Sequence, residues 1–101
     1  RGNDVTDKGV AHLGKLIKLE GLYLGETGVT DAGVRELVAL KELKKLWLHD
    51  LPITDESVPI LSEIKSLREI HIYATKISAE GAGMLQSALP KCRVIHESLT
   101  N

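Results

Sequence analysis

Histidine and carboxylate side chains are the residues of this sequence whose spacing could support metal chemistry. His49 and His71 belong to segments that we predict to be neighbouring strands, with Cβ atoms about 7–8 Å apart on the diagonal. A zinc ion would need both imidazoles and either Asp50 or His96 as a further ligand. A catalytic zinc would also need a pocket, whereas a sheet surface is open. We therefore interpret the histidines as solvated and expect neither a metal nor another cofactor.

The nucleophilic side chains form no catalytic pattern. Cys92 is the single cysteine, so no internal disulfide can form, and we interpret it as a small buried apolar side chain. The serines fall in predicted turns, helix caps and helices, without a base at a recognisable spacing. Gly81-Ala82-Gly83 is not followed by the Lys-Ser or Lys-Thr of a phosphate-binding loop. The sequence therefore favours a protein that is not an enzyme.

Composition and charge argue against two classes of partner. Hydrophobic residues make up 43% and charged residues 27% of the 101 residues, which is typical of a folded globular domain. The formal net charge is −1 and the basic residues form no run, so we expect no nucleic-acid partner. No stretch approaches the roughly 20 apolar residues of a membrane-spanning helix, so we expect no membrane partner.

A repeat with an offset of 24 residues organises the whole chain. Asp31 matches Asp7 and Asp55, and a glycine column has Ser57 as its exception. So many matched positions at one offset indicate stacked structural units that share one core. The apolar columns are Val5, Val29, Ile53 and Ile77; Val10, Val34, Val58 and Ala82; Leu13, Leu37, Leu61 and Leu85; Leu22, Leu46 and Ile70; and Leu24, Leu48 and Ile72.

Each unit contains one strand and one helix. Leu22 and Leu24 alternate with Tyr23, which predicts a strand with one buried face, and the apolar residues that recur every three positions predict a helical stripe. Thr30 is placed to cap its helix, and Asp31 lies at the positive end of the helix dipole. We expect thirteen residues of these columns to be buried. They are Val29, Ile53 and Ile77, together with every member of the columns that begin at Leu13, Leu22 and Leu24. The predicted strands are 21–25, 45–49, 69–73 and a partial 93–96, and the predicted helices are 7–18, 31–41, 57–65 and 79–88.

One unit of the repeat reads Leu19-x-x-Leu22-x-Leu24-x-x-Thr27-x-Val29-Thr30-Asp31-x-Gly33-Val34-x-x-Leu37. This unit resembles the leucine-rich repeat, in a bacterial or cysteine-containing-like variety with a Thr-Asp-x-Gly motif. The resemblance covers residues 3 to about 95 and implies an α/β solenoid: a curved right-handed superhelix with a concave parallel sheet and convex helices. Two positions depart from the pattern. Leu51 stands where the family has a polar loop residue, and Pro59 would delay the third helix to Ser57 or Val58.

The two ends of the array carry separate expectations. We expect residues 1–101 to form one domain of about four repeats, cut from a longer chain, with residues 90–101 as a C-terminal cap. One extra residue near 86–88 would align Ile95 with Leu22 and place His96 in the column of His71. At the other end, strand 21–25 has no neighbour before it, and the stripe from Val10 to Leu19 is uncovered. We therefore expect self-association through this N-terminal edge.

The outward positions of the predicted strands collect every aromatic residue of the chain. Tyr and Trp beside histidine and carboxylate are residues from which binding surfaces are built. The favoured function is a protein-interaction module whose concave face takes a protein or peptide. A carbohydrate-binding module, an architectural spacer, and a cross-strand ladder that only stabilises the sheet are the alternatives. The candidate binding residues are Tyr23, Lys45, Trp47, His49, Asp50, Glu69, His71 and Tyr73.

Overall fold

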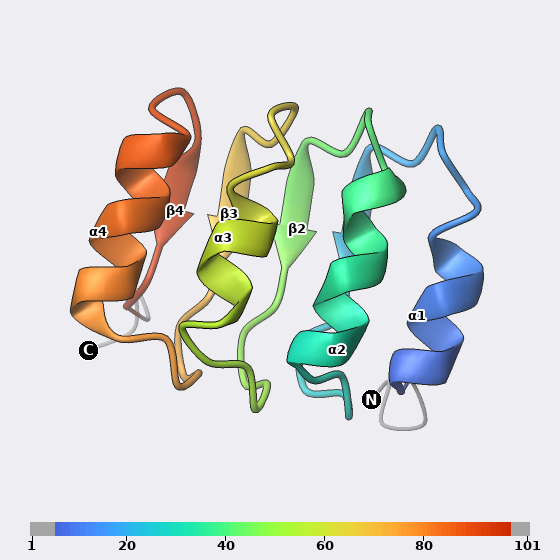
Figure 1. Cartoon of the computed structure of the whole chain (residues 1–101), viewed down its shortest axis with the longest axis horizontal. Helices are drawn as coiled ribbons and strands as arrows, with labels where there is room; N and C mark the ends of the chain where they lie inside the picture. The colour runs from blue at the N-terminus through green and yellow to red at the C-terminus, as the bar shows by residue number, and fades with distance from the viewer. Residues whose placement is uncertain (1–5, 98–101) are drawn as a thin grey trace.

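The computed structural model describes residues 6–97, which form two layers: a four-stranded parallel sheet and a row of helices packed along one of its faces (Figure 1). The strand order β1-β2-β3-β4 follows the chain, with a helical segment between successive strands. The elements are α1 (Asp7–Leu13), β1 (Gly21–Tyr23), α2 (Asp31–Val34), the 3₁₀ helix η1 (Arg35–Ala39), β2 (Lys45–Trp47), α3 (Ser57–Leu61), β3 (Glu69–His71), α4 (Ala79–Ala88) and β4 (Arg93–Ile95).

Strand pairing keeps one register throughout the sheet. Leu22 pairs with Leu46, Leu46 with Ile70, and Ile70 with Val94. Since side chains alternate along a strand, this row faces the helices, while the residues on either side of it face away from them. Backbone bonds extend the pairing past each strand, from Leu24 N–H to the carbonyl of Trp47 at 2.8 Å and equivalently in the next pairs.

The core is aliphatic and lies between the two layers. Eleven of the thirteen residues predicted to be buried are so, among them Leu46, Leu48 and Ile72 at 0% exposure. Leu13 and Leu22 are the exceptions and are only partly buried. Both belong to the first unit, and residues 6–97 place a neighbouring unit on only one side of it.

The helices are shorter than predicted, except α4, which has the predicted bounds. In the first unit α1 ends at Leu13, and the chain continues through bonds three residues apart, such as Leu16 N–H to the Leu13 carbonyl at 2.9 Å. An apolar residue every third position suits this tighter geometry better than an α-helix. The helix α3 begins at Ser57, as Pro59 predicts. In residues 6–97, every helix is too short or too polar to cross a membrane.

The Thr-Asp pairs do more than cap helices. Thr30 caps α2 as predicted, and Ser78 caps α4 in the equivalent position, whereas Thr6 makes no capping bond and Thr54 bonds Glu56 N–H in the turn before α3. Each Asp carboxylate reaches into the next unit, where it accepts hydrogen bonds from both the backbone N–H and the hydroxyl of Thr or Ser. The hydroxyl bonds measure 2.5 Å from Thr30 to Asp7, 2.7 Å from Thr54 to Asp31, and 2.8 Å from Ser78 to Asp55.

The glycine column makes room for these carboxylates. A Cβ atom on Gly33 would lie 2.3 Å from Oδ1 of Asp7, and one on Gly81 would lie 2.3 Å from Oδ1 of Asp55. Ser57 is the exception in this column, and its hydroxyl donates to Oδ1 of Asp31 at 2.5 Å. The column therefore holds residues that either avoid or bond the carboxylate of the preceding unit.

The last unit differs from the prediction. Leu89 and Cys92 are buried where Ile64 and Leu67 lie one unit earlier, so the segment before β4 does hold one extra residue. The strand nevertheless pairs Ile95 with His71, not with Ile70. The extra residue is compensated between Cys92 and Arg93, because β4 pairs with β3 at the same 24-residue offset as the earlier strands. His96 is therefore outside the column of His71, and its Nε2 bonds the carbonyl of Ile77 at 3.0 Å.

Candidate functional site

Five rings lie in mutual contact on the sheet face opposite the helices, and we call them the aromatic face. Tyr23, Trp47 and His71 occupy the paired outward positions of β1, β2 and β3. Their ring centroids are 6.1 and 5.3 Å apart. His49 and Tyr73, just beyond β2 and β3, stack at 4.8 Å, and edge contacts to Tyr23 and His71 join the two rows. The structure thus brings together all five ring-bearing residues predicted to share one face.

Exposure is uneven across the aromatic face. Tyr23 is 61% exposed, and Trp47, His71 and Tyr73 are partly exposed. His49 is 4% exposed, so the prediction of a solvated histidine is wrong there. The reason is Gly25, whose missing side chain leaves the space that the imidazole fills: a Cβ atom on Gly25 would lie 2.4 Å from Cε1 of His49.

The polar members of the candidate site flank the rings. Glu69 bonds His71 through Nε2 at 2.7 Å along the same strand, and within residues 6–97 His71 does not belong to the group of possible metal ligands that contains His49. That hydrogen bond is the main cause that lowers the pKa of Glu69; burial opposes it, and the charges of His71, Lys45 and Arg93 add to it. Lys45 and Asp50 are exposed.

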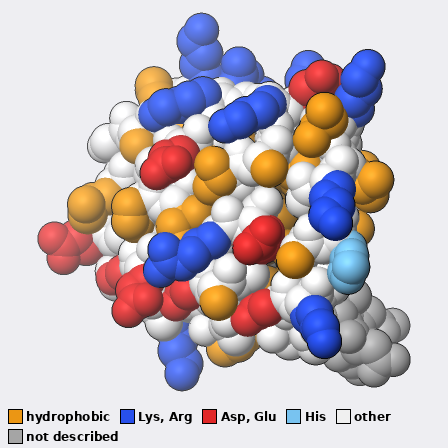
Figure 2. Space-filling view, turned by 45° about the vertical axis from the view of Figure 1, so that its right-hand side comes forward, with side chains coloured by type: hydrophobic (Ala, Val, Ile, Leu, Met, Phe, Trp, Pro, Cys, Tyr) orange, Lys and Arg blue, Asp and Glu red, His pale blue; other side chains and the backbone are white. Residues whose placement is uncertain are grey.

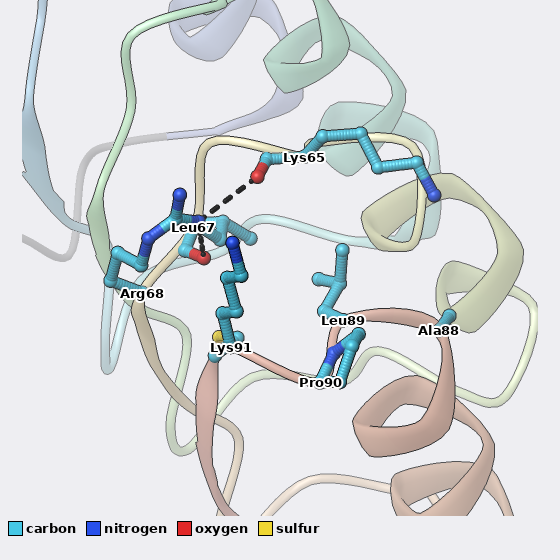
Figure 3. A pocket seen from close by; sticks show the side chains of 8 residues that line it. Lys65, Leu67, Arg68, Ala88, Leu89, Pro90 and Lys91 are labelled. Carbon is cyan, nitrogen blue, oxygen red and sulfur yellow. Dashed lines mark hydrogen bonds between the residues drawn. The ribbon is translucent and has the colours of Figure 1, made fainter.

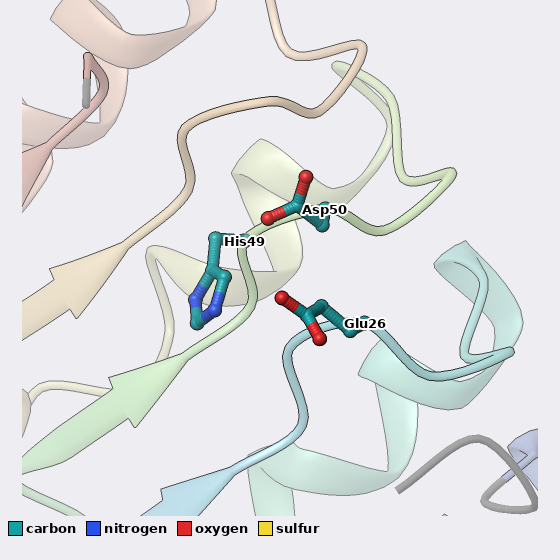
Figure 4. A group of neighbouring side chains, drawn as sticks. All are labelled: Glu26, His49 and Asp50. Carbon is teal, nitrogen blue, oxygen red and sulfur yellow. The ribbon is translucent and has the colours of Figure 1, made fainter. Parts of the chain in front are cut away.

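Carboxylates gather near His49 at the end of β2. Glu26 and Asp50 occupy equivalent turn positions after β1 and β2, both with positive φ, at 64° and 58°. One ligand atom from each of Glu26, His49 and Asp50 lies within 4.8 Å of the others (Figure 4). The pKa of Tyr73 is raised, chiefly by burial and then by Tyr23 and these two carboxylates. Sequence reasoning missed Glu26; its place one unit before Asp50 was the available signal.

Two small surface hollows, formed by residues of the third and fourth units, lie outside the aromatic face. One, of about 210 Å³, lies between Lys65, Arg68 and Lys91 beside Cys92 (Figure 3). The guanidinium of Arg68 in this hollow donates hydrogen bonds to backbone carbonyls, including that of Leu67 at 2.9 Å. The other, of about 310 Å³, lies between α3 and α4.

Burial raises the pKa of Cys92 to about 11, which keeps the thiol protonated at neutral pH and fits its interpretation as a packing residue.

The N-terminal end carries exposed apolar side chains. Leu16 is 51% and Ile17 57% exposed, and with Lys18 and Leu19 they line an open hollow of about 540 Å³. Val10, which we predicted to be uncovered, is fully buried. Figure 2 turns this side of the molecule forward and shows hydrophobic, basic and acidic side chains mixed over it. Val5 of the apolar columns and residues 98–101 of the expected C-terminal cap lie outside the described residues.

Comparison with known proteins supports the fold. No protein-family model and no curated protein sequence matches the chain. Among solved structures, a leucine-rich-repeat protein of Leptospira interrogans superposes with a TM-score of 0.57 at 19% identity. The match covers 83% of this chain and 27% of that protein, so the chain corresponds to little more than a quarter of its length. With the parallel sheet and its helical layer, this likeness identifies a leucine-rich-repeat-like fold.

Proposed function

We propose that this chain is a protein-interaction module that presents the aromatic face to a protein or peptide. The observation that supports it is the contiguous cluster of rings on the helix-free side of the sheet, with Tyr23 61% exposed at its edge. Tyr and Trp dominate the energetically important positions of protein interfaces because they bury large areas with few rotatable bonds. Lys45 and Asp50 beside the rings supply the polar rim that such interfaces have.

Ring stacking favours a peptide over the carbohydrate alternative. A sugar packs on an open ring face, but here ring faces cover one another: Trp47 and His71 are inclined by 11°, and His49 and Tyr73 by 15°. Neither the two smaller hollows nor the N-terminal one is lined by a residue of the aromatic face. The rings therefore present mainly edges, which suit the irregular surface of a peptide.

Selection from a displayed peptide library on the immobilised chain tests the proposal. Peptides enriched on the unmodified chain should lose binding to Tyr23→Ser and Trp47→Ala variants whose circular dichroism is unchanged. Met84→Ser is the matched control, because Met84 is also 61% exposed but lies on α4. Peptides that bind Tyr23→Ser undiminished, or that lose binding only to Met84→Ser, would contradict the proposal. Failure to enrich any peptide would favour the architectural role.

A further inference from the structure

His49 carries a buried nitrogen with no hydrogen-bond partner. The residue is 4% exposed, and Nδ1 is the buried side-chain nitrogen or oxygen in residues 6–97 for which the structure shows no partner. The other ring nitrogen, Nε2, lies 2.9 Å from the hydroxyl of Tyr23. Buried polar atoms in folded proteins are nearly always satisfied, so an orphaned imidazole nitrogen calls for a ligand.

The ring of His49 lies beside the carboxylates of Glu26 and Asp50. Its Cε1 atom faces Gly25, and its Nε2 atom lies 2.9 Å from the hydroxyl of Tyr23. One ring nitrogen lies within 4.8 Å of a carboxylate oxygen of Glu26 and of one of Asp50. Figure 4 shows the carboxylates of Glu26 and Asp50 flanking the space beside the imidazole, with their ligand atoms and that of His49 within 4.8 Å of one another.

We propose that Glu26, His49 and Asp50 bind a divalent transition-metal ion, for which Zn²⁺ is the best match. One imidazole nitrogen with two carboxylates suits Zn²⁺, whereas Mg²⁺ and Ca²⁺ prefer oxygen ligands alone. Tyr23 suits this arrangement, because its hydroxyl lies 2.9 Å from Nε2 and can accept a hydrogen bond in the tautomer that carries the proton on Nε2 and leaves the Nδ1 lone pair for the metal. Water takes the fourth position of the tetrahedron.

Closure of the site requires only a small movement. Ligand atoms at about 2.0–2.2 Å from Zn²⁺ in tetrahedral geometry lie roughly 3.3–3.6 Å apart, and the three ligand atoms here lie within 4.8 Å of one another. Glu26 and Asp50 are exposed, so their side chains have room to approach the buried imidazole. The site does not depend on peptide binding, and peptide selection in the presence of a chelator separates the two proposals.

Titration of the intact chain with Zn²⁺ by calorimetry tests the site. We expect one Zn²⁺ per chain, with binding weakened about 100-fold or more in Glu26→Gln and in Asp50→Asn, since loss of a mere outer-shell partner costs roughly 10–100-fold. Both carboxylates are exposed, so these variants retain the fold. Glu69→Gln is the matched control, because Glu69 bonds a different histidine, His71, on the same face.

Nuclear magnetic resonance of the imidazole nitrogens provides the second measurement. Zn²⁺ should shift Nδ1 of His49 and leave the resonances of His12, His71 and His96 in place. The proposal is overturned if the chain binds no Zn²⁺, if affinity survives both Glu26→Gln and Asp50→Asn, or if it falls equally in Glu69→Gln. A shift confined to another histidine would also overturn it.

Discussion

The carboxylate of Asp31 holds α2 and α3 together through three hydrogen bonds, and its replacement by Ala measures what that connection contributes. The donors are the backbone N–H of Thr54 at 2.9 Å, its hydroxyl at 2.7 Å and the hydroxyl of Ser57 at 2.5 Å. Ser57 is fully buried, so an unpartnered hydroxyl there costs about 1–3 kcal/mol. Water can replace the carboxylate as the partner of Thr54, so the loss of the Thr54 bonds adds only about 1 kcal/mol to the cost. The expected loss in free energy of unfolding is about 2–4 kcal/mol.

The matched comparison is Asp55→Ala. This carboxylate bonds only the backbone N–H and hydroxyl of Ser78, an exposed residue, so water compensates and the expected loss is about 0.5–1.5 kcal/mol. Urea denaturation followed by circular dichroism and by the fluorescence of Trp47 gives both values. Equal losses in the two variants, or a loss below about 1 kcal/mol for Asp31→Ala, would refute the argument from burial.

The hydrogen bonds that Asp31 accepts have a predicted pH dependence. Burial raises the pKa of Asp31, but the bonds from Ser57 and Thr54 and the charge of Arg35 outweigh it, so the pKa lies below its ordinary value of 3.8. A lowered pKa in the folded state means that the stabilisation is fully present above the pKa of the unfolded chain. It is lost as the pH falls through the folded-state value. The difference between the unmodified chain and Asp31→Ala should therefore shrink below about pH 4.

Three further outcomes are expected. Leu48→Ala should lower the free energy of unfolding by about 2–5 kcal/mol in denaturant titration, because Leu48 is fully buried in mid-array; a loss below about 1 kcal/mol would contradict the packing. Gly33→Ala should destabilise the chain, because its Cβ would meet the carboxylate of Asp7, whereas Gly83→Ala on the open surface of α4 should raise its melting temperature; the reverse order would count against the glycine column. Sedimentation at high concentration should show weak self-association that Ile17→Lys removes, and a strictly monomeric unmodified chain would disprove it.

Most of the fold could be predicted because its main determinant is a repeated spacing. An offset of 24 residues set the strand register, and alternation of Leu22 and Leu24 around Tyr23 set which side faces the helices. Helix lengths were overestimated because an apolar residue every third position is compatible with both α and 3₁₀ geometry. The register of β4 was predicted wrongly because the chain changes alignment after Cys92. Leu89 and Cys92 are buried at positions shifted by one residue, whereas Arg93 to Ile95 pair with β3 at the unshifted 24-residue offset.

The residues of the aromatic face could be predicted, but the burial of His49 and the place of Glu26 beside it could not. Alternation along the strands was enough to place Tyr23, Trp47 and His71 side by side. The burial of His49 depends on a contact with Gly25, and a pairwise contact of this kind leaves no pattern in a single sequence. The neighbouring turn column, in which Glu26 matches Asp50 and Ala74, has no shared side-chain type, so the only signal for Glu26 was its place one unit before Asp50.

The hydrogen bonds from each Asp to the next unit limit how such a chain can change in length. Asp7, Asp31 and Asp55 each accept hydrogen bonds from a Thr or Ser that lies 23 residues later, and the strands pair 24 residues apart. Insertion of one residue between an Asp and its donor would break that bond and shift a strand's side chains to the opposite face. Duplication or deletion of a complete unit preserves both. Recombination in whole units is therefore the route by which this array can be lengthened, shortened or re-engineered, with the face residues free to vary from unit to unit.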